Sequence, residues 1–210
     1  MTTVGRWSPN KVRKRVLDGT WVVPTEIISS VALVSPTSVD VTGAGSSATI
    51  SSYGGVSFSS CATIALNGVF KSGYDNYQVV HRALGSSESS VINFRLRAGG
   101  TNTSGSDYTD QYIFASGTSL TGSRSAAGAS PSILAYNTTY RSGMVIYLWG
   151  PYLAQPTAIA TRAIDARTGN ANIVDLSVFH SLSTAYDGFY FAVSAGTITG
   201  SLAVYGFKGS

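Results

Sequence analysis

Short apolar runs alternate with turn-forming clusters along most of the chain, from Glu26 onward. The runs are rich in Val, Ile, Tyr and Phe, and the clusters between them are rich in Gly, Ser, Thr, Pro, Asn and Asp. This pattern is typical of short β-strands separated by turns. It predicts strands at Ile27–Val34, Ser38–Thr42, Val56–Ser59, Thr63–Phe70, Tyr77–Ala83, Val91–Ala98, Gln111–Ala115, Met144–Trp149, Ala158–Ile164, Ile173–His180, Gly188–Ser194 and Ile198–Phe207.

The clearest alternation lies in the run Val91–Ala98. Successive side chains of a strand point to opposite faces, so this run has one apolar face and one polar face. The predicted core positions are Ile92, Phe94, Leu96 and Ala98, opposite Asn93, Arg95 and Arg97. Many short strands with turn-rich connections favour an all-β fold, an antiparallel β-sandwich of the jelly-roll type. The stretches Ala98–Asp110 and Ser116–Ser132 are predicted to be exposed Gly/Ser/Thr loops, with Gly122–Gly128 mobile.

Residues 1–25 are predicted to form a short N-terminal arm, and residues 26–210 to form the β-sandwich domain. Ser8 and Pro9 are a helix-start signal, so a short helix is predicted over residues 9–18. A helix of this length is marginal without a partner surface. Up to Glu26 the chain has five basic and two acidic residues, so +3 of the total charge of +4 lies in this part.

The composition limits the function classes. Charged residues make up only 11% of the chain and hydrophobic residues 43%, which allows a real core beneath a neutral, hydroxyl-rich surface. Such surfaces occur where subunits pack together or where neutral ligands such as glycans dock, although β-propensity alone explains the composition equally well. The single cysteine, Cys61, excludes an internal disulfide bond and is expected to be a small buried residue. Neither a signal peptide nor a long apolar run is present, so membrane insertion is not expected.

Catalytic motifs are weak, and the chain is predicted not to be an enzyme. Its two histidines, His81 and His180, fall in predicted strands, where a hydrogen-bonded structural role is usual. Asp107 and Asp110 flank a tyrosine in a predicted loop, and a solvated loop explains them better than a cation site does. A carboxylate pair for glycoside cleavage stays open, because the sequence cannot place two of the ten acidic residues together. No catalytic residue, cofactor or metal ligand is assigned.

The segment Tyr74, Asp75, Asn76 and Tyr77 is a candidate glycan-binding site. An aromatic ring can stack on a sugar while amide and carboxylate groups fix its hydroxyls. The alternative is a hairpin or loop corner in which the tyrosines pack inward, and this alternative is favoured because the turn formers lie together.

The arm has the features of an attachment segment. Trp7 and Trp21 flank its basic run and can supply buried area, and Arg13 and Arg15 would be attracted to an acidic protein surface. Nucleic-acid binding is the weaker interpretation, because three clustered basic residues without a recognised fold are a poor signal. We therefore expect Trp7, Arg13, Arg15 and Trp21 to anchor the protein to the surface of another protein.

Short pieces of the chain carry a resemblance to a known family. In chain order they are Ile64–Phe70, Tyr74–Tyr77, Phe94–Arg97, Tyr186–Phe189 and Ile198–Gly206. They resemble the C-terminal β-domains of bacteriophage tail-fibre, minor tail and head-decoration proteins, over most of the chain from Ser60 to Phe207. The resemblance implies a homotrimeric virion protein, assembled in the host cytoplasm, and supplies no catalytic residues.

Two functions are implied by the resemblance. The first is a tail-associated structural protein, a tail fibre or minor tail protein, that binds a host-surface glycan. The second is a trimeric capsid decoration or cement protein that stabilises the head. No coiled-coil, collagen-like or β-helical shaft precedes the domain, which favours compact attachment through the arm to other virion proteins.

Overall fold

The computed structural model describes residues 30–136, 141–165 and 171–208. These residues form β-strands, turns and bends, and none of them is helical. The predicted arm helix and the anchoring residues Trp7, Arg13, Arg15 and Trp21 lie outside the described residues. Within the described ranges, no helix is long and apolar enough to cross a membrane.

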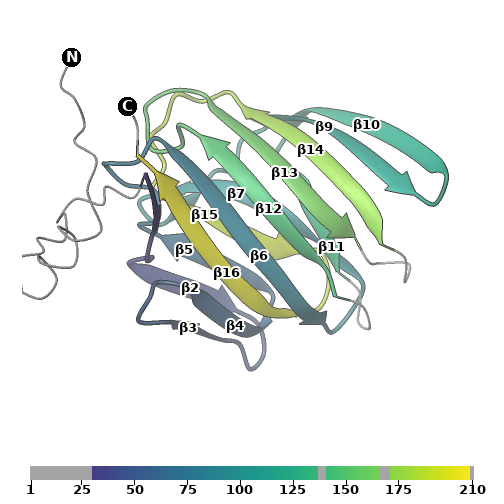
Figure 1. Cartoon of the computed structure of the whole chain (residues 1–210), viewed down its shortest axis with the longest axis horizontal. Coiled ribbons are helices and arrows are strands. Elements are labelled where there is room, and N and C mark those ends of the chain that lie inside the picture. Colours follow the sequence, from purple (N-terminus) through teal and green to yellow (C-terminus); the bar gives the residue numbers. More distant parts are fainter. Residues whose placement is uncertain (1–29, 137–140, 166–170, 209–210) are drawn as a thin grey trace, which may run out of the picture. The chain divides into compact units, whose positions relative to one another are not determined.

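The strands form two antiparallel sheets (Figure 1). The larger, ten-stranded sheet has the order β10-β9-β14-β13-β12-β6-β16-β4-β3, with β1 paired to β16 beside this path. Its strands are β1 (Val31–Leu33), β3 (Ser47–Ile50), β4 (Val56–Cys61), β6 (Asn76–Ser86), β9 (Tyr108–Ser116), β10 (Ser119–Gly128), β12 (Gly143–Trp149), β13 (Thr157–Asp165), β14 (Asn172–His180) and β16 (Ile198–Phe207). The smaller, six-stranded sheet has the order β11-β7-β15-β5-β2, with β8 paired to β7. Its strands are β2 (Ser38–Thr42), β5 (Thr63–Asn67), β7 (Ser90–Ala98), β8 (Thr101–Asn102), β11 (Ser132–Tyr136) and β15 (Gly188–Val193).

The two sheets pack on one hydrophobic core, which confirms the predicted antiparallel β-sandwich. In β7 the predicted alternation is also confirmed, because Ile92, Phe94 and Leu96 are fully buried. Aromatic rings fill the centre of the core. The ring of Phe189 lies 5.0 Å from that of Phe191 and 6.0 Å from that of Phe94. The core therefore depends on side chains from neighbouring strands of the smaller sheet.

The prediction of a loop at Ser116–Ser132 is wrong over most of its length, because Ser119–Gly128 forms β10. β10 pairs with β9 as a hairpin at one end of the larger sheet (Figure 1). Nearly all of its side chains are exposed or half-buried on both faces, so no apolar alternation marks it in the sequence. Backbone pairing with β9 holds it in the extended conformation despite its Gly and Ser content. The short strands β3, β8 and β11 were not predicted either.

Cys61 is fully buried, as predicted, at the end of β4. Its thiol lies 3.2 Å from the carbonyl oxygen of Ser59, and burial raises the pKa of the thiol. A buried thiol with a raised pKa is a poor nucleophile. Cys61 therefore serves as a packing residue.

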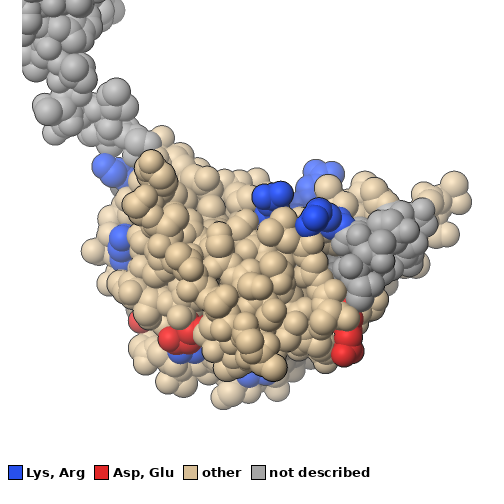
Figure 2. All heavy atoms as spheres, turned by 90° about the horizontal axis from the view of Figure 1, so that it is seen from below, with Lys and Arg blue, Asp and Glu red and all other residues tan. Residues whose placement is uncertain are grey.

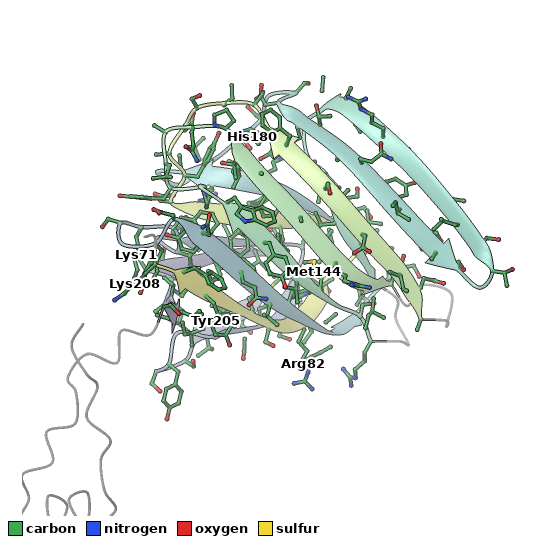
Figure 3. The ribbon with its side chains drawn as sticks, turned by 45° about the horizontal axis from the view of Figure 1, so that its top comes forward. Lys71, Arg82, Met144, His180, Tyr205 and Lys208 are labelled. Carbon is green, nitrogen blue, oxygen red and sulfur yellow. The ribbon has the colours of Figure 1, made fainter. Side chains whose placement is uncertain are left out.

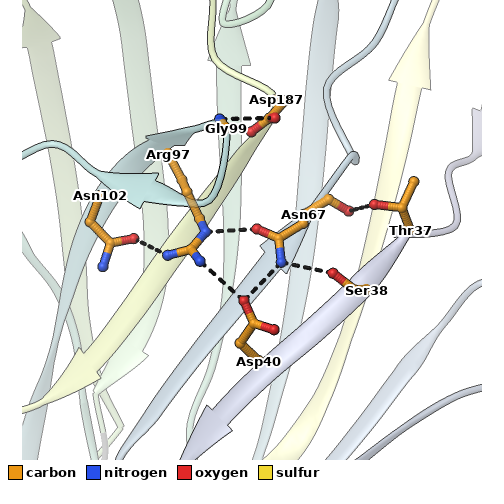
Figure 4. Close-up of polar contacts among 8 residues, drawn as sticks. All are labelled: Thr37, Ser38, Asp40, Asn67, Arg97, Gly99, Asn102 and Asp187. Atoms are coloured by element: carbon orange, nitrogen blue, oxygen red, sulfur yellow. Dashed lines mark hydrogen bonds and ion pairs between the residues drawn. The ribbon is translucent and has the colours of Figure 1, made fainter.

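A polar network covers the outer face of the smaller sheet near its end (Figure 4). The guanidinium group of Arg97 donates to Oδ1 of Asn67 at 2.7 Å, to Oδ1 of Asn102 at 2.6 Å and to Oδ2 of Asp40 at 3.0 Å. Asn67 in turn donates to Ser38 and Asp40. These bonds join β7, β8, β5 and β2 across the sheet, so the network is structural and its donors are already occupied.

Replacing Arg97 with methionine should lower the free energy of unfolding by about 1–3 kcal/mol. The change removes a largely buried charged donor and leaves the Oδ1 atom of Asn67 without its hydrogen-bond donor. The side chain of Arg97 is only 11% exposed, whereas that of Asp40 is 59% exposed. An exposed ion pair contributes only about 0–1 kcal/mol, so Asp40→Ala should cost less. Urea unfolding of the two variants measures both values. Equal losses in the two variants would contradict the structural role given to Arg97.

Candidate functional site

The outer face of the ten-stranded sheet carries an unusual number of exposed aromatic side chains. β12 shows how they arise: Met144, Ile146 and Leu148 point into the core, and Tyr147 and Trp149 point outward. Both faces of this strand are apolar. Tyr147 is 40% exposed and Trp149 is 46% exposed. Exposed aromatic side chains grouped on one face mark a binding surface more often than a structural one.

Strand pairing aligns these aromatic residues in two rows across the sheet. In the order β16, β6, β12, β13 and β14, the first row is Phe207, Asn76, Trp149, Ala158 and Phe179. In the same order, the second row is Tyr205, Gln78, Tyr147, Ala160 and Ser177. We call these ten residues the aromatic face. Figure 3 labels Tyr205 on β16, at one end of the second row.

Aromatic residues of the aromatic face lie on alternate strands, β16, β12 and β14, and amide or small residues lie on the strands between them. Neighbouring strands are about 4.8 Å apart, so the aromatic strands repeat at about 10 Å. The small alanines of β13 leave Trp149 and Phe179 standing above the sheet surface on either side. The result is a ridged surface with amide groups between the rings.

The rings of β12 are held in place by their neighbours. The ring planes of Tyr147 and Trp149 are nearly parallel, at 24°, with their centres 6.2 Å apart. The side-chain amide of Gln78 donates to the hydroxyl oxygen of Tyr147 at 3.2 Å. This bond fixes the tyrosine ring and leaves the amide oxygen of Gln78 available to a ligand.

Next to the aromatic face, the same side of the sheet has an open hollow of about 560 Å³. Gly143, which has no side chain, lies at this hollow. The outward side chains that line it are those of Val80, Val145, Tyr147, Arg162, Ile164 and Ile173. A second hollow borders it across Val80 and reaches Arg82 and Ser201. Tyr147 therefore belongs both to the aromatic face and to the wall of the first hollow.

Charged groups are sparse on this surface. On the outward positions of the described strands of the larger sheet they are Arg82, Arg124, Arg162 and Asp175. Figure 2 shows the molecule from below the view of Figure 1, and there too uncharged residues form most of the visible surface. The groups that this face offers to a ligand are therefore aromatic rings, amides and a few arginines.

The structure separates the four residues predicted to bind a glycan. Tyr77 is 1% exposed and points into the core, where its hydroxyl donates to the carbonyl oxygen of Lys71 at 2.9 Å. Burial raises the pKa of Tyr77 to about 12. Tyr74 packs against the core, with its ring 6.1 Å from that of Tyr77. The assignment of Tyr77 to a sugar site is corrected, because strand alternation turns it inward and its ring cannot stack on a ligand.

Asn76, the neighbour of Tyr77, points the opposite way and belongs to the aromatic face, paired with Trp149 and Phe207. The backbone of Asp75 closes the same corner, since its carbonyl oxygen accepts a hydrogen bond from Gly150 at 2.9 Å. One of the four predicted residues thus lies in the candidate site, and one lies at its border.

The two histidines lie in strands, as predicted. His81 is buried against Phe58 and Phe191, and its Nδ1 atom lies 3.1 Å from the carbonyl oxygen of Ser201. Burial lowers the pKa of His81 to about 4. The ring of His81 is therefore packed within the core.

His180 is also buried, at the far end of β14. Its Nε2 atom lies 2.5 Å from the hydroxyl oxygen of Tyr186, and the ring of Tyr108 covers it at 4.4 Å. Burial lowers the pKa of His180 and raises that of Tyr186. Of the acidic pair predicted in a loop, Asp110 lies in β9. The described residues contain no group of three or more His, Cys, Asp or Glu side chains placed to hold a metal ion.

Comparison with known proteins gives no family assignment, since no family model and no curated protein matches the chain. Among solved structures, the chain is similar to a protein of unknown function from Shewanella oneidensis MR-1, at 10% identity and a TM-score of 0.27, covering 98% of this chain and 97% of that one. It is also similar to the CBM2 module of the evolved Dit of Lactobacillus casei BL23 phage J-1, at 9% identity and a TM-score of 0.29, covering 89% and 94%. Likenesses this low assign no function, so the resemblance to phage proteins stays a prediction from sequence.

Proposed function

We propose that the protein is a tail-associated bacteriophage structural protein whose β-sandwich binds a host-surface glycan through the aromatic face. The observation that carries the glycan proposal is the alternation of aromatic strands (β16, β12 and β14) with strands that carry amide (β6) or alanine (β13) side chains, with Tyr147, Trp149 and Phe179 exposed. The proposal assigns binding to the chain and no catalysis.

A sugar has two kinds of surface, and the aromatic face has a group for each. The apolar C–H side of a pyranose ring stacks on an aromatic ring, as on Trp149 or Tyr147. The hydroxyl groups need donors and acceptors, which Asn76 and Gln78 supply beside those rings. A repeat of about 10 Å between aromatic strands suits an extended chain in which alternate sugar units stack.

Tail location is supported by the sequence resemblance described above, and capsid decoration is the alternative. Labelling the protein on intact particles separates the two. Label at the tail agrees with the proposal, whereas label spread over the head, together with fragile particles when the protein is missing, favours the decoration role.

We further propose that residues 1–25 attach the protein to other virion proteins, through Trp7 and Trp21 with help from Arg13 and Arg15. A buried large side chain contributes about 1.5–3 kcal/mol, and an exposed charge pair contributes about 0–1 kcal/mol. Incorporation into particles should therefore fall more for Trp7→Ala with Trp21→Ala than for Arg13→Ala with Arg15→Ala. Normal incorporation of a chain without residues 1–25 would place the attachment surface elsewhere.

Homotrimer formation remains a proposal, and the structure offers a surface for it. A row of apolar residues crosses the end of the larger sheet. In the order β13, β14, β9 and β10, it is Ile164, Ile173, Ala115 and Leu120. Leu120 is 71% exposed, and the row ends at β10, the edge strand. A second copy that covers the β10 end of this row, at Ala115 and Leu120, would also cover the unpaired edge of β10. Light scattering of the wild type should give a trimer, and Leu120→Asp should give a monomer; a monomeric wild type would count against the proposal.

Replacing Trp149 with alanine should weaken glycan binding about tenfold. If a sugar covers about 60 Å² of the indole, roughly 25 cal/mol per Å² gives about 1.5 kcal/mol, which is about a factor of ten in affinity. Calorimetry with a polysaccharide selected on a glycan microarray measures this change. Tyr53→Ala is the matched control, because Tyr53 is an exposed aromatic residue in the turn between β3 and β4 and should leave the affinity unchanged. Unchanged affinity in the Trp149 variant would show that the aromatic face does not bind the glycan.

A further inference from the structure

We infer that the glycan bound by this surface is acidic, and that Arg82 and Arg162 hold its carboxylate or phosphodiester groups. This inference rests on the proposed function, because it names the class of glycan that the same face takes. Its basis is the position of these two arginines beside the aromatic face and the weak pairing of their charges among the described residues.

Arg82 on β6 and Arg162 on β13 lie on either side of β12, on the outward side of the sheet. Arg82 is paired with Gly143, and Arg162 is paired with Val145. Two strand spacings and a two-residue offset along β12 separate their backbones by about 12 Å. The residues between them are small, so the two guanidinium groups stand above the low floor of the hollows.

Among the described residues, these arginines have weak ion-pair partners or none. Arg162 has only a loose contact with Asp175, at 3.7 Å, and both side chains are more than half exposed. Arg82 is exposed and makes no ion pair with any described residue, and Figure 3 shows it projecting from the end of β6. Arg97 is the contrasting case, because its side chain is only 11% exposed and already bonds three side-chain partners.

An acidic polysaccharide fits this arrangement better than a neutral one. Guanidinium groups bind carboxylates and phosphates through charge-assisted hydrogen bonds, and they do so without deprotonation at any working pH. A sugar unit stacked on Tyr147 places its neighbours over the hollow that Tyr147 and Arg162 both line. An acidic group on that neighbouring unit therefore meets Arg162 directly.

The test uses the full chain on a microarray of bacterial surface polysaccharides that contains neutral, uronate-bearing and phosphodiester-linked members. We expect binding to acidic members, either the uronate or the phosphodiester group, with affinity that falls as salt rises. Binding confined to neutral members would overturn this inference and leave the proposed function intact. Binding to no polysaccharide would overturn both.

Charge removal then tests the two arginines. Arg82→Gln with Arg162→Gln should reduce the affinity for the selected acidic polysaccharide at least about tenfold. Arg124→Gln is the matched control, because Arg124 lies on the same face on β10, three strands from Arg162, and should have little effect. Equal losses in the two variants, or none in either, would refute the assignment of the arginines.

Gly143→Val is a steric test that keeps both charges. A Cβ atom at this position meets the carbonyl oxygen of His81 at 3.4 Å, an ordinary contact, so the variant is expected to fold. The added side chain would fill the floor between the arginines and reduce acidic-glycan binding by a similar factor. Circular dichroism confirms folding, and wild-type affinity in a folded Gly143→Val variant would show that the glycan does not cross this floor.

Discussion

Replacing Phe189 with alanine should lower the free energy of unfolding by about 3–5 kcal/mol. Phe189 is fully buried, and its ring lies between those of Phe70, Phe94 and Phe191 at 5.0–6.0 Å. Truncation removes the apolar contact area and leaves a cavity that neighbouring strands cannot close. Because small domains are stable by only about 5–15 kcal/mol, this loss is a large part of the total.

The matched control for Phe189 is Phe179→Ala. Phe179 is 50% exposed on the outer face of β14, so its loss should cost less than about 1 kcal/mol. Urea unfolding of the two variants compares them directly. A Phe189 variant no less stable than the Phe179 variant would show that the aromatic cluster is not the centre of the core.

Lowering the pH from 7 to 4 should lower the free energy of unfolding by about 3 kcal/mol through His81 alone. Burial lowers the pKa of His81 from 6.5 to about 4, so the folded protein keeps the ring neutral where the unfolded chain takes up a proton. Each unit of pKa difference corresponds to about 1.4 kcal/mol. The stabilisation is complete above pH about 6.5 and is lost progressively as the pH falls toward about 4.

Two measurements check the role of His81. Urea unfolding between pH 7 and pH 4 should show the fall, and His180 should add to it in the same direction because burial lowers its pKa as well. The ring signals of His81 in nuclear magnetic resonance spectra isolate its own contribution. They should stay those of a neutral imidazole through pH 5, and titration near pH 6.5 would contradict the burial described for this ring.

The sequence predicted the fold well where one face of a strand is apolar and the other is polar. β7 is the clearest case, because Ile92, Phe94 and Leu96 alternate with polar residues and are fully buried. β2 and β16 begin and end at the predicted residues. Alternation was informative there because burial on one side leaves only one register that satisfies the pattern.

Prediction failed where the two faces of a strand are alike, either both polar or both apolar. β10 is polar or small on both faces, so its sequence is that of a loop although its backbone pairs with β9. β12 is apolar on both faces, so the sequence could not tell that Tyr147 and Trp149 point outward. The strand order that aligns them with Tyr205 and Phe179 is non-local and has no signature in the sequence.

The predicted segment Tyr74–Tyr77 shows the same limit at single residues. Its mixture of aromatic, amide and carboxylate groups suggested a sugar site, but a strand begins at Asn76 and sends neighbouring side chains to opposite faces. Asn76 therefore joins the aromatic face, and Tyr77 joins the core. Residue chemistry alone could not show which of these side chains face outward, because the strand register decides it.

Binding of the fluorescently labelled full chain to cells of the host bacterium tests the central claim most directly. The wild type and the Tyr53→Ala control should bind the cells to the same extent, and the double variant Tyr147→Ala with Trp149→Ala should not bind, while circular dichroism shows all three to be folded. Cell binding by the double variant at the wild-type level would contradict the claim that the aromatic face of the ten-stranded sheet holds the host glycan.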